Sequence, residues 1–109
     1  MTVTVVAMVS INDDEPLALA EYFRVTGPLL ERAGAKIKKT FNINEVVVGH
    51  RPAKKVFVVE YPDKAAVDMV FQSQEYKNVI PSRDLAFSHY SVSIAADDSL
   101  SAPDAAAND

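Results

Sequence analysis

The chain has 109 residues, of which 49% are apolar and 24% charged, and its formal net charge is −4. This length favours a single domain, and this apolar fraction excludes a chain that is disordered throughout. The absence of cysteine excludes disulfides, thiolate nucleophiles, iron–sulfur clusters and cysteine-type zinc sites. No apolar run approaches the ~18 residues of a membrane helix, and the N-terminus has no signal-peptide pattern. We therefore expect a cytoplasmic protein that does not bind a membrane.

The acidic excess is concentrated at the C-terminus. Residues 95–109 contain four aspartates and no lysine or arginine, so the rest of the chain, with 11 acidic and 11 basic residues, is neutral. The composition predicts a folded domain over residues 1–95 and a disordered acidic tail over 96–109, because the tail has little apolar surface to offset the entropy of ordering. A neutral body with an acidic tail also lacks the clustered basic face of a nucleic-acid-binding protein.

The first half of the chain predicts a strand and a long helix. Val3–Ile11 is rich in β-branched residues and apolar on both faces, which is typical of a central strand. Asn12–Pro16 supplies a helix start, and Gly34 is a helix stop. Gly27-Pro28 predicts a kink or short break within this helix, because proline removes a backbone donor.

The second half predicts three more strands and further helical segments. Lys36–Gly49 alternates loosely and ends in a strand at Val46–Val48, followed by a turn at His50–Ala53. Val56–Tyr61 is a strongly apolar strand, and Pro62-Asp63 ends it and caps a second helix. The core face of that helix is predicted to hold Ala65, Ala66, Met69, Val70 and Phe71. A further helical turn over Glu75–Ile80 stops near Pro81, and Ser88–Ile94 is the last strand.

The resulting β-α-β-β-α-β order predicts an α+β, ferredoxin-like fold with a four-stranded antiparallel sheet. Right-handed crossovers place the first and third strands in the centre, where we expect them to be parallel to each other. Two helices cover only one face of four strands, yet the central strands are apolar on both faces. We therefore expect a second copy of the chain to cover the other face, which gives a homodimer.

Three short motifs in the second half carry a family resemblance: Glu60-Tyr61-Pro62, Ser73-Gln74-Glu75-Tyr76 and Pro81-Ser82-Arg83. With the strand and helix between them, they resemble the domain-of-unknown-function family number thirteen-thirty of the dimeric α/β-barrel superfamily. The resemblance implies a dimeric, ferredoxin-like α/β barrel. It implies little about chemistry, because that superfamily includes cofactor-free monooxygenases, isomerases and haem-handling proteins.

Polar residues near the last strand form the first candidate site. We expect Glu60, Tyr61 and His89 to share one end of the sheet, with Arg83 in the segment leading to His89. Arg83 would bind an anionic group, and His89 or Glu60 would move a proton at the mouth of a cleft between sheet and helices. The alternative is a structural ion pair between Glu60 and Arg83, with His89 on a half-exposed face.

Tyr22, Phe23, Tyr61 and His50 are the candidate ligand-binding residues. The alternative for Tyr22 and Phe23 is a place in the hydrophobic core, and for His50 a solvated hairpin. We expect His50 and His89 at opposite ends of the sheet, so no metal site is predicted. With three glycines and no glycine-rich phosphate motif, the sequence also predicts no nucleotide or other cofactor.

Three functions follow from these residues. The first is a small homodimer that binds a small, partly apolar molecule in a cleft between sheet and helices. The second is a cofactor-independent monooxygenase or isomerase that uses Glu60, Arg83 and His89. The third is a structural or regulatory dimer without a ligand. The sequence leaves open whether the protein is an enzyme.

Overall fold

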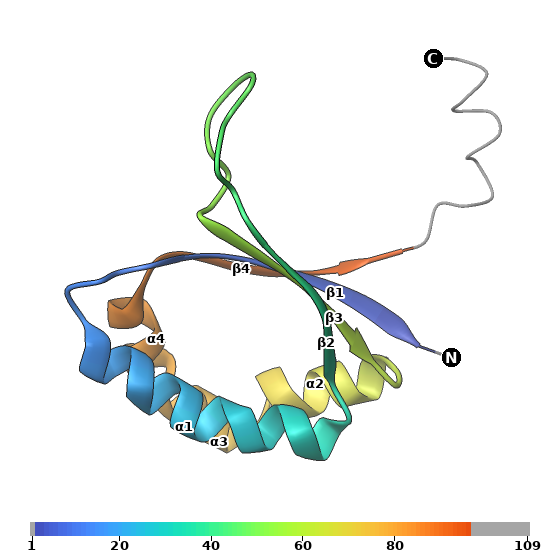
Figure 1. Cartoon of the computed structure of the whole chain (residues 1–109). Helices are drawn as coiled ribbons and strands as arrows, with labels where there is room; N and C mark the ends of the chain where they lie inside the picture. Colours follow the sequence, from blue (N-terminus) through green and yellow to red (C-terminus); the bar gives the residue numbers. More distant parts are fainter. Residues whose placement is uncertain (1, 97–109) are drawn as a thin grey trace, which may run out of the picture.

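The computed structural model describes residues 2–96, in which one four-stranded sheet carries the helices on a single face (Figure 1). The strands are β1 (Val3–Ile11), β2 (Lys36–Asn42), β3 (Lys55–Tyr61) and β4 (Phe87–Ala95). The helices are α1 (Pro16–Ala33), α2 (Lys64–Phe71), α3 (Gln74–Asn78) and α4 (Ile80–Ala86). The predicted β-α-β-β-α-β order is confirmed, with the second helical region divided into three. Residues 97–109 of the predicted tail lie outside the described residues.

The strand order is β2-β3-β1-β4, and every neighbouring pair is antiparallel. The prediction that β1 and β3 are central is confirmed, whereas the prediction that they are parallel is wrong. Each helical crossover joins strands that point the same way but are not neighbours, namely β1 to β2 and β3 to β4. The turn between β2 and β3 reverses the chain, so β3 runs against β1.

The sheet face toward the helices holds the core. Residues of β1 and β3 alternate between the two faces, and Val5, Val9, Val59 and Tyr61 are buried beneath the helices. No helix of residues 2–96 covers the opposite face (Figure 1). Part of its surface is nevertheless apolar, since the paired residues Val6 and Val58 point to that side. As predicted, the central strands have apolar residues on both faces of the sheet, whereas the helices cover only one face.

Helix α1 runs without interruption from Pro16 to Ala33, so the predicted break at Gly27-Pro28 is wrong. Both residues lie on the exposed side of the helix. The carbonyl that loses its backbone donor to Pro28 is thus on the solvent side, where water can replace the missing bond. The predicted stop is confirmed, because Gly34 adopts the left-handed conformation with φ 75°. The buried side of the helix holds Tyr22, Thr26, Leu29 and Ala33.

Helix α2 begins as predicted, with the Asp63 carboxylate accepting a hydrogen bond from the Ala66 backbone N–H at 2.8 Å. The predicted core face is partly wrong. Ala65 is exposed and Met69 is 52% exposed, whereas Val67, which was not predicted, is buried. The Asp63 cap fixes the phase of the helix, and this phase directs Ala66, Val67 and Val70 toward the sheet.

Pro81 was predicted to stop a helical turn, and the structure corrects this. It lies in the first turn of α4, where the missing N–H costs nothing because no carbonyl in the helix would accept it. Helix α4 then leads directly into β4 at Phe87. Pro81 therefore starts the segment that carries Arg83 toward the sheet.

The connection between β2 and β3 projects away from the sheet (Figure 1). Its base is closed by a hydrogen bond from the Ile43 N–H to the Lys54 carbonyl, at 2.8 Å. The strand predicted at Val46–Val48 is absent from the structure, and Val47 and Val48 are 87% and 89% exposed. A β-branched run forms a strand only beside a partner, and the projecting segment has no sheet next to it. Within residues 2–96, no helix combines the length and apolar character needed to cross a membrane.

Candidate functional site

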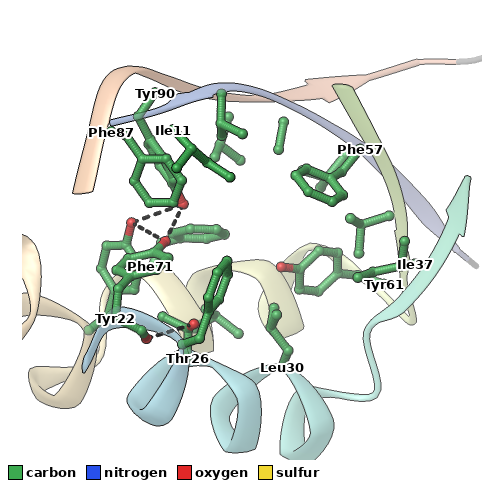
Figure 2. A pocket seen from close by; sticks show the side chains of 18 residues that line it. Ile11, Tyr22, Thr26, Leu30, Ile37, Phe57, Tyr61, Phe71, Phe87 and Tyr90 are labelled. Atoms are coloured by element: carbon green, nitrogen blue, oxygen red, sulfur yellow. Dashed lines mark hydrogen bonds between the residues drawn. The ribbon is translucent and has the colours of Figure 1, made fainter. Parts of the chain in front are cut away.

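A cavity of about 120 Å³ lies between the sheet and the helices (Figure 2). Its walls are almost entirely hydrocarbon and aromatic, and none of the lining residues within 2–96 is charged. The sheet contributes Val5, Ala7, Val9, Ile11, Ile37, Phe57, Val59, Tyr61, Phe87, Tyr90 and Val92; the helices contribute Tyr22, Phe23, Thr26, Leu30, Val70, Phe71 and Tyr76. An apolar hollow with a few hydroxyl groups is the usual form of a small-molecule site.

Three tyrosine hydroxyls meet at one end of the cavity. The Tyr76 oxygen lies 3.2 Å from the Tyr22 oxygen and 3.2 Å from the Tyr90 oxygen, and Tyr22 and Tyr90 are hydrogen-bonded to each other. We call Tyr22, Tyr76 and Tyr90 the tyrosine triangle. It joins α1, α3 and β4, which are far apart in the sequence. In a closed ring of three hydroxyls, each O–H can donate once to its neighbour, so the three donors are used within the ring.

The rings of the triangle are packed as well as hydrogen-bonded. The Tyr22 ring is edge-on to those of Tyr76, Phe87 and Tyr90, with centroid separations of 6.0, 5.3 and 5.9 Å. Edge-to-face pairs add about 0.5–1.5 kcal/mol each beyond the burial of their area. This end of the cavity is therefore a rigid part of the core.

Local capping places Tyr76 in the triangle. The Ser73 hydroxyl accepts a hydrogen bond from the Tyr76 backbone N–H at 3.0 Å and donates one to the Val70 carbonyl at 2.7 Å. The same serine therefore ends α2 and starts α3. The Ser73–Tyr76 motif seen in the sequence thus acts as a corner that turns the tyrosine toward the sheet.

Arg83 contacts the tyrosine triangle on the side of the surface groove. Its Nη1 donates to the Tyr76 hydroxyl at 3.3 Å, and its guanidinium carbon lies 5.2 Å from the centre of the Tyr90 ring. Its Nη2 is 3.2 Å from the Asp84 carboxylate. The arginine side chain is 25% exposed, so the cation stacks on aromatic rings while one edge stays in water.

The environment of Tyr22, Tyr61 and Tyr90 moves the pKa of each of these hydroxyls further above neutral pH. Burial, followed by the neighbouring hydroxyls, raises the pKa of Tyr22, and burial raises the pKa of Tyr90. Burial also raises the pKa of Tyr61 to about 12, with a smaller contribution from Tyr76. Tyr22, Tyr61 and Tyr90 can therefore form hydrogen bonds near pH 7 but cannot act as phenolate bases.

Tyr61 lies at the other end of the cavity from the triangle, and its hydroxyl points into the open space (Figure 2). The residue is only 2% exposed. Among the residues that the structure describes, no partner forms a hydrogen bond with this hydroxyl, whereas Thr26, at the same cavity, donates to the Tyr22 carbonyl at 2.9 Å. The cavity thus has one end of paired hydroxyls and one end with an unpaired hydroxyl.

One edge of the cavity is apolar and exposed, and a polar surface groove lies beside the cavity. Phe23 and Ile37 line it and are 51% and 58% exposed, so it opens between α1 and β2. On the side of β4 lies a surface groove that contains Arg83 and His89. Tyr76, Tyr90, Phe71, Phe87 and Val92 line both hollows and form the wall between them.

The structure separates the residues of the predicted polar cluster. Arg83 and His89 line the same groove, but Glu60 pairs with Thr4 at one end of β1 whereas His89 pairs with Ser10 at the other. Six residues of strand correspond to roughly 20 Å. The prediction that His89 shares its end with Glu60 and Tyr61 is wrong, because β3 and β4 are parallel to each other, so the end of one lies far from the start of the other.

The alternative ion pair between Glu60 and Arg83 is also not formed, since the carboxylate partner of Arg83 is Asp84. Tyr22, Phe23 and Tyr61 line the cavity. His50 lies in the exposed connection between β2 and β3 and borders neither hollow.

The predicted separation of the two histidines needs a correction. The connection that carries His50 leaves the sheet beside Lys55, which pairs with Val9, and His89 pairs with the adjacent Ser10. Both histidines therefore belong to the same end of the sheet. Over residues 2–96, no group of three or more His, Asp or Glu side chains is arranged to hold a metal ion.

Sequence reasoning missed Tyr76 and Tyr90 as site residues. Tyr90 was placed on the apolar face of the last strand, and a buried tyrosine on such a face needs a hydrogen-bond partner for its hydroxyl. That requirement could have indicated from the sequence that Tyr90 has a hydrogen-bond partner. It could not have identified the partners, because Tyr22 and Tyr76 come from separate helices.

Comparisons with solved structures give the same fold. A protein of unknown function from Rhodopseudomonas palustris, RPA0582, superposes with a TM-score of 0.71 at 22% identity, over 86% of this chain and 80% of that one. Rv0793 from Mycobacterium tuberculosis gives 0.59 at 18% identity, over 89% and 95%. A candidate monooxygenase from Lactobacillus acidophilus gives 0.59 at 18% identity, over 85% of this chain and 43% of that one.

No curated protein matches the sequence of this chain. A family match, by contrast, covers the whole described region, residues 2–96. The chain belongs to the family described as Domain of unknown function (DUF1330).

Proposed function

We propose that this protein binds a small, mainly apolar molecule in the cavity between the sheet and the helices. The observation that carries the proposal is the cavity itself, which is about 120 Å³ in volume, has no charged residue among its described lining residues and opens between α1 and β2. Apolar surface inside such a hollow gains from displacing water or filling empty space. The aromatic packing at the triangle end keeps the hollow in shape before a ligand arrives.

A cavity-filling variant tests this proposal. Ala7 lines the cavity from β1, so Ala7→Leu should occupy much of the space and weaken binding of a small hydrocarbon such as methylenecyclohexane at least tenfold. The matched control is Ala65→Leu, because this exposed residue of α2 lines neither hollow. Titration followed by two-dimensional NMR measures both affinities. Equal affinity in Ala7→Leu and the unchanged protein would contradict the proposal.

A second candidate is a cofactor-independent monooxygenase or isomerase. It is favoured by the placement of Arg83 and His89 in one groove that shares Tyr76 and Tyr90 with the cavity, and by the likeness to a candidate monooxygenase. In this mechanism Arg83 binds an anionic group at the groove and His89 moves a proton. Glu60 is too far away to take part.

Turnover separates the enzyme from the binding protein. Small molecules extracted from the purified protein are returned to it, and oxygen uptake and product formation are followed by electrode and mass spectrometry. An enzyme should lose at least tenfold in rate in His89→Ala, while a binding protein gives no product with either chain. An empty cavity after extraction, and no binding of added hydrocarbons, would favour the third function, a structural or regulatory dimer.

The homodimer expected from the sequence is likewise a proposal. It is supported by the sheet face without helices, on which Val6 and Val58 lie side by side with Met8 and Val56. Native mass spectrometry should give twice the chain mass of 11.9 kDa. Val58→Lys should shift the mass to that of one chain, and Glu31→Lys on the exposed side of α1 should not. The cytoplasmic location expected from the sequence stays a prediction.

A further inference from the structure

The hydroxyl of Tyr61 belongs to a core residue but forms no hydrogen bond within the part of the chain that the structure describes. Its residue is 2% exposed, and the oxygen has no hydrogen-bond partner in residues 2–96. Yet no side-chain nitrogen or oxygen in that part of the chain is both fully enclosed and unpartnered. The Tyr61 oxygen must therefore face open space, and the close view shows that this space is the cavity (Figure 2). A ligand atom that accepts a hydrogen bond from this hydroxyl would therefore add one protein–ligand hydrogen bond.

Every other hydroxyl donor at the cavity is already used. The Thr26 hydroxyl donates to the Tyr22 carbonyl at 2.9 Å. In the tyrosine triangle, the three O–H groups can each donate to a neighbour, and Arg83 supplies a further donor to Tyr76. Among the described lining residues, Tyr61 is thus the one hydroxyl whose proton is free for a ligand. The ordinary pKa of tyrosine already lies well above neutral pH, and burial raises the pKa of Tyr61 further, to about 12.

The cavity also selects against charge. None of the described lining residues carries a charge, and Arg83 lies in the neighbouring groove with its N–H groups directed to Tyr76 and Asp84. An ion in such surroundings would lose its hydration without gaining a counter-charge. A neutral ligand avoids this cost.

The volume limits the size of the ligand. A dry engineered cavity of about 150 Å³ binds benzene. The cavity here, at about 120 Å³, is of similar size. It therefore suits a molecule of roughly six to eight non-hydrogen atoms, with some enlargement toward the opening at Phe23 and Ile37.

We propose that the ligand of this cavity is a small neutral molecule, mostly hydrocarbon, with one carbonyl or ether oxygen that accepts a hydrogen bond from Tyr61. This inference rests on the proposed binding function and specifies its chemistry. Tyr61 is a binding residue in this proposal, and the tyrosine triangle is the packed wall opposite to it.

The test compares two probes of nearly equal shape, cyclohexanone and methylenecyclohexane, which differ by an oxygen acceptor in place of a carbon. Both are titrated into the full chain and into Tyr61→Phe, with dissociation constants taken from two-dimensional NMR shifts. Tyr61→Phe should weaken cyclohexanone binding about 3–10-fold and change methylenecyclohexane binding less than twofold. Comparing each probe between two proteins cancels the difference in its hydration.

Thr26→Val is the matched control, because it removes a hydroxyl from the same cavity whose proton is already donated to the Tyr22 carbonyl. Thr26→Val should not weaken the binding of cyclohexanone more than that of methylenecyclohexane. Hexanoate and cyclohexylammonium ions serve as charged probes of similar size and should bind at least tenfold more weakly than cyclohexanone.

Two failures have different meanings. If methylenecyclohexane binds but Tyr61→Phe leaves the affinity for cyclohexanone unchanged, the oxygen-acceptor inference is overturned and the binding function stands. The same holds if hexanoate binds more tightly than the ketone. If neither neutral probe binds, both the inference and the proposed function fall.

Discussion

The two ends of the cavity use the same residue type for different purposes. At one end, Tyr22, Tyr76 and Tyr90 bond to one another and pack edge-on, so their hydroxyls satisfy each other inside the protein. At the other end, Tyr61 is as deeply buried but has no protein partner among the described residues. A buried polar group that is paired contributes to the fold, whereas one that is unpaired and faces a cavity is available for a ligand.

The largest expected effect concerns stability and separates the two ends. Tyr22→Phe removes two hydrogen bonds of the triangle and leaves Tyr76 and Tyr90 short of partners, so the free energy of unfolding should fall by about 1–3 kcal/mol. Tyr61→Phe removes no protein hydrogen bond and should change it by less than about 0.5 kcal/mol. Urea unfolding followed by circular dichroism measures both.

An equal loss in the two variants would mean that the Tyr61 hydroxyl has a partner in the folded protein. The distinction between paired hydroxyls at one end of the cavity and an unpaired hydroxyl at the other would then be wrong. Val59→Ala, which truncates a core residue next to Tyr61 on β3, confirms that the assay detects a loss of about 1–3 kcal/mol.

Alkaline pH should affect both ends in the same direction. The pKa of Tyr61 is raised from 10.0 to about 12, so above pH 10 the unfolded chain loses this proton while the folded chain retains it. The contribution of this group to the free energy of unfolding is therefore constant below pH 10 and decreases between pH 10 and 12, by at most about 1.4 kcal/mol per pH unit. The raised pKa values of Tyr22 and Tyr90 act with the same sign.

Urea midpoints measured from pH 7 to 11 check this dependence. Tyr61→Phe should reduce the slope with which stability falls with pH above pH 10, and it should leave the stability at pH 7 nearly unchanged. A slope that is identical with and without the Tyr61 hydroxyl would show that this group titrates normally in the folded protein.

The smallest expected effect is at the outer side of the triangle. Arg83→Lys loses the planar stacking on Tyr76 and Tyr90 and should lower stability by about 0.5–1 kcal/mol. Asp84→Asn removes a largely exposed ion pair and should cost less than about 0.5 kcal/mol. The same urea experiment ranks them, and the reverse ranking would mean that the ion pair, not the aromatic stacking, fixes Arg83.

Much of the fold follows from local patterns. The strand at Val3–Ile11, the stop at Gly34 and the cap at Asp63 depend on residues next to one another in the chain, and the structure confirms each. Two wrong predictions also come from local patterns. Val46–Val48 has strand-forming residues but no neighbouring strand, and Pro81 can begin a helix as readily as it can end one.

The sequence by itself determined the order of the elements, the central place of β1 and β3, and the aromatic residues Tyr22, Phe23 and Tyr61 as candidates for a hollow. Only the tertiary structure decided which side chains meet. The direction of β3 and β4 relative to β1 separates Glu60 from His89, and the packing of three elements brings Tyr22, Tyr76 and Tyr90 together. Hydrogen-bond partners distant in the sequence depend on strand direction and helix phase, and neither is written in the spacing of residues along the chain.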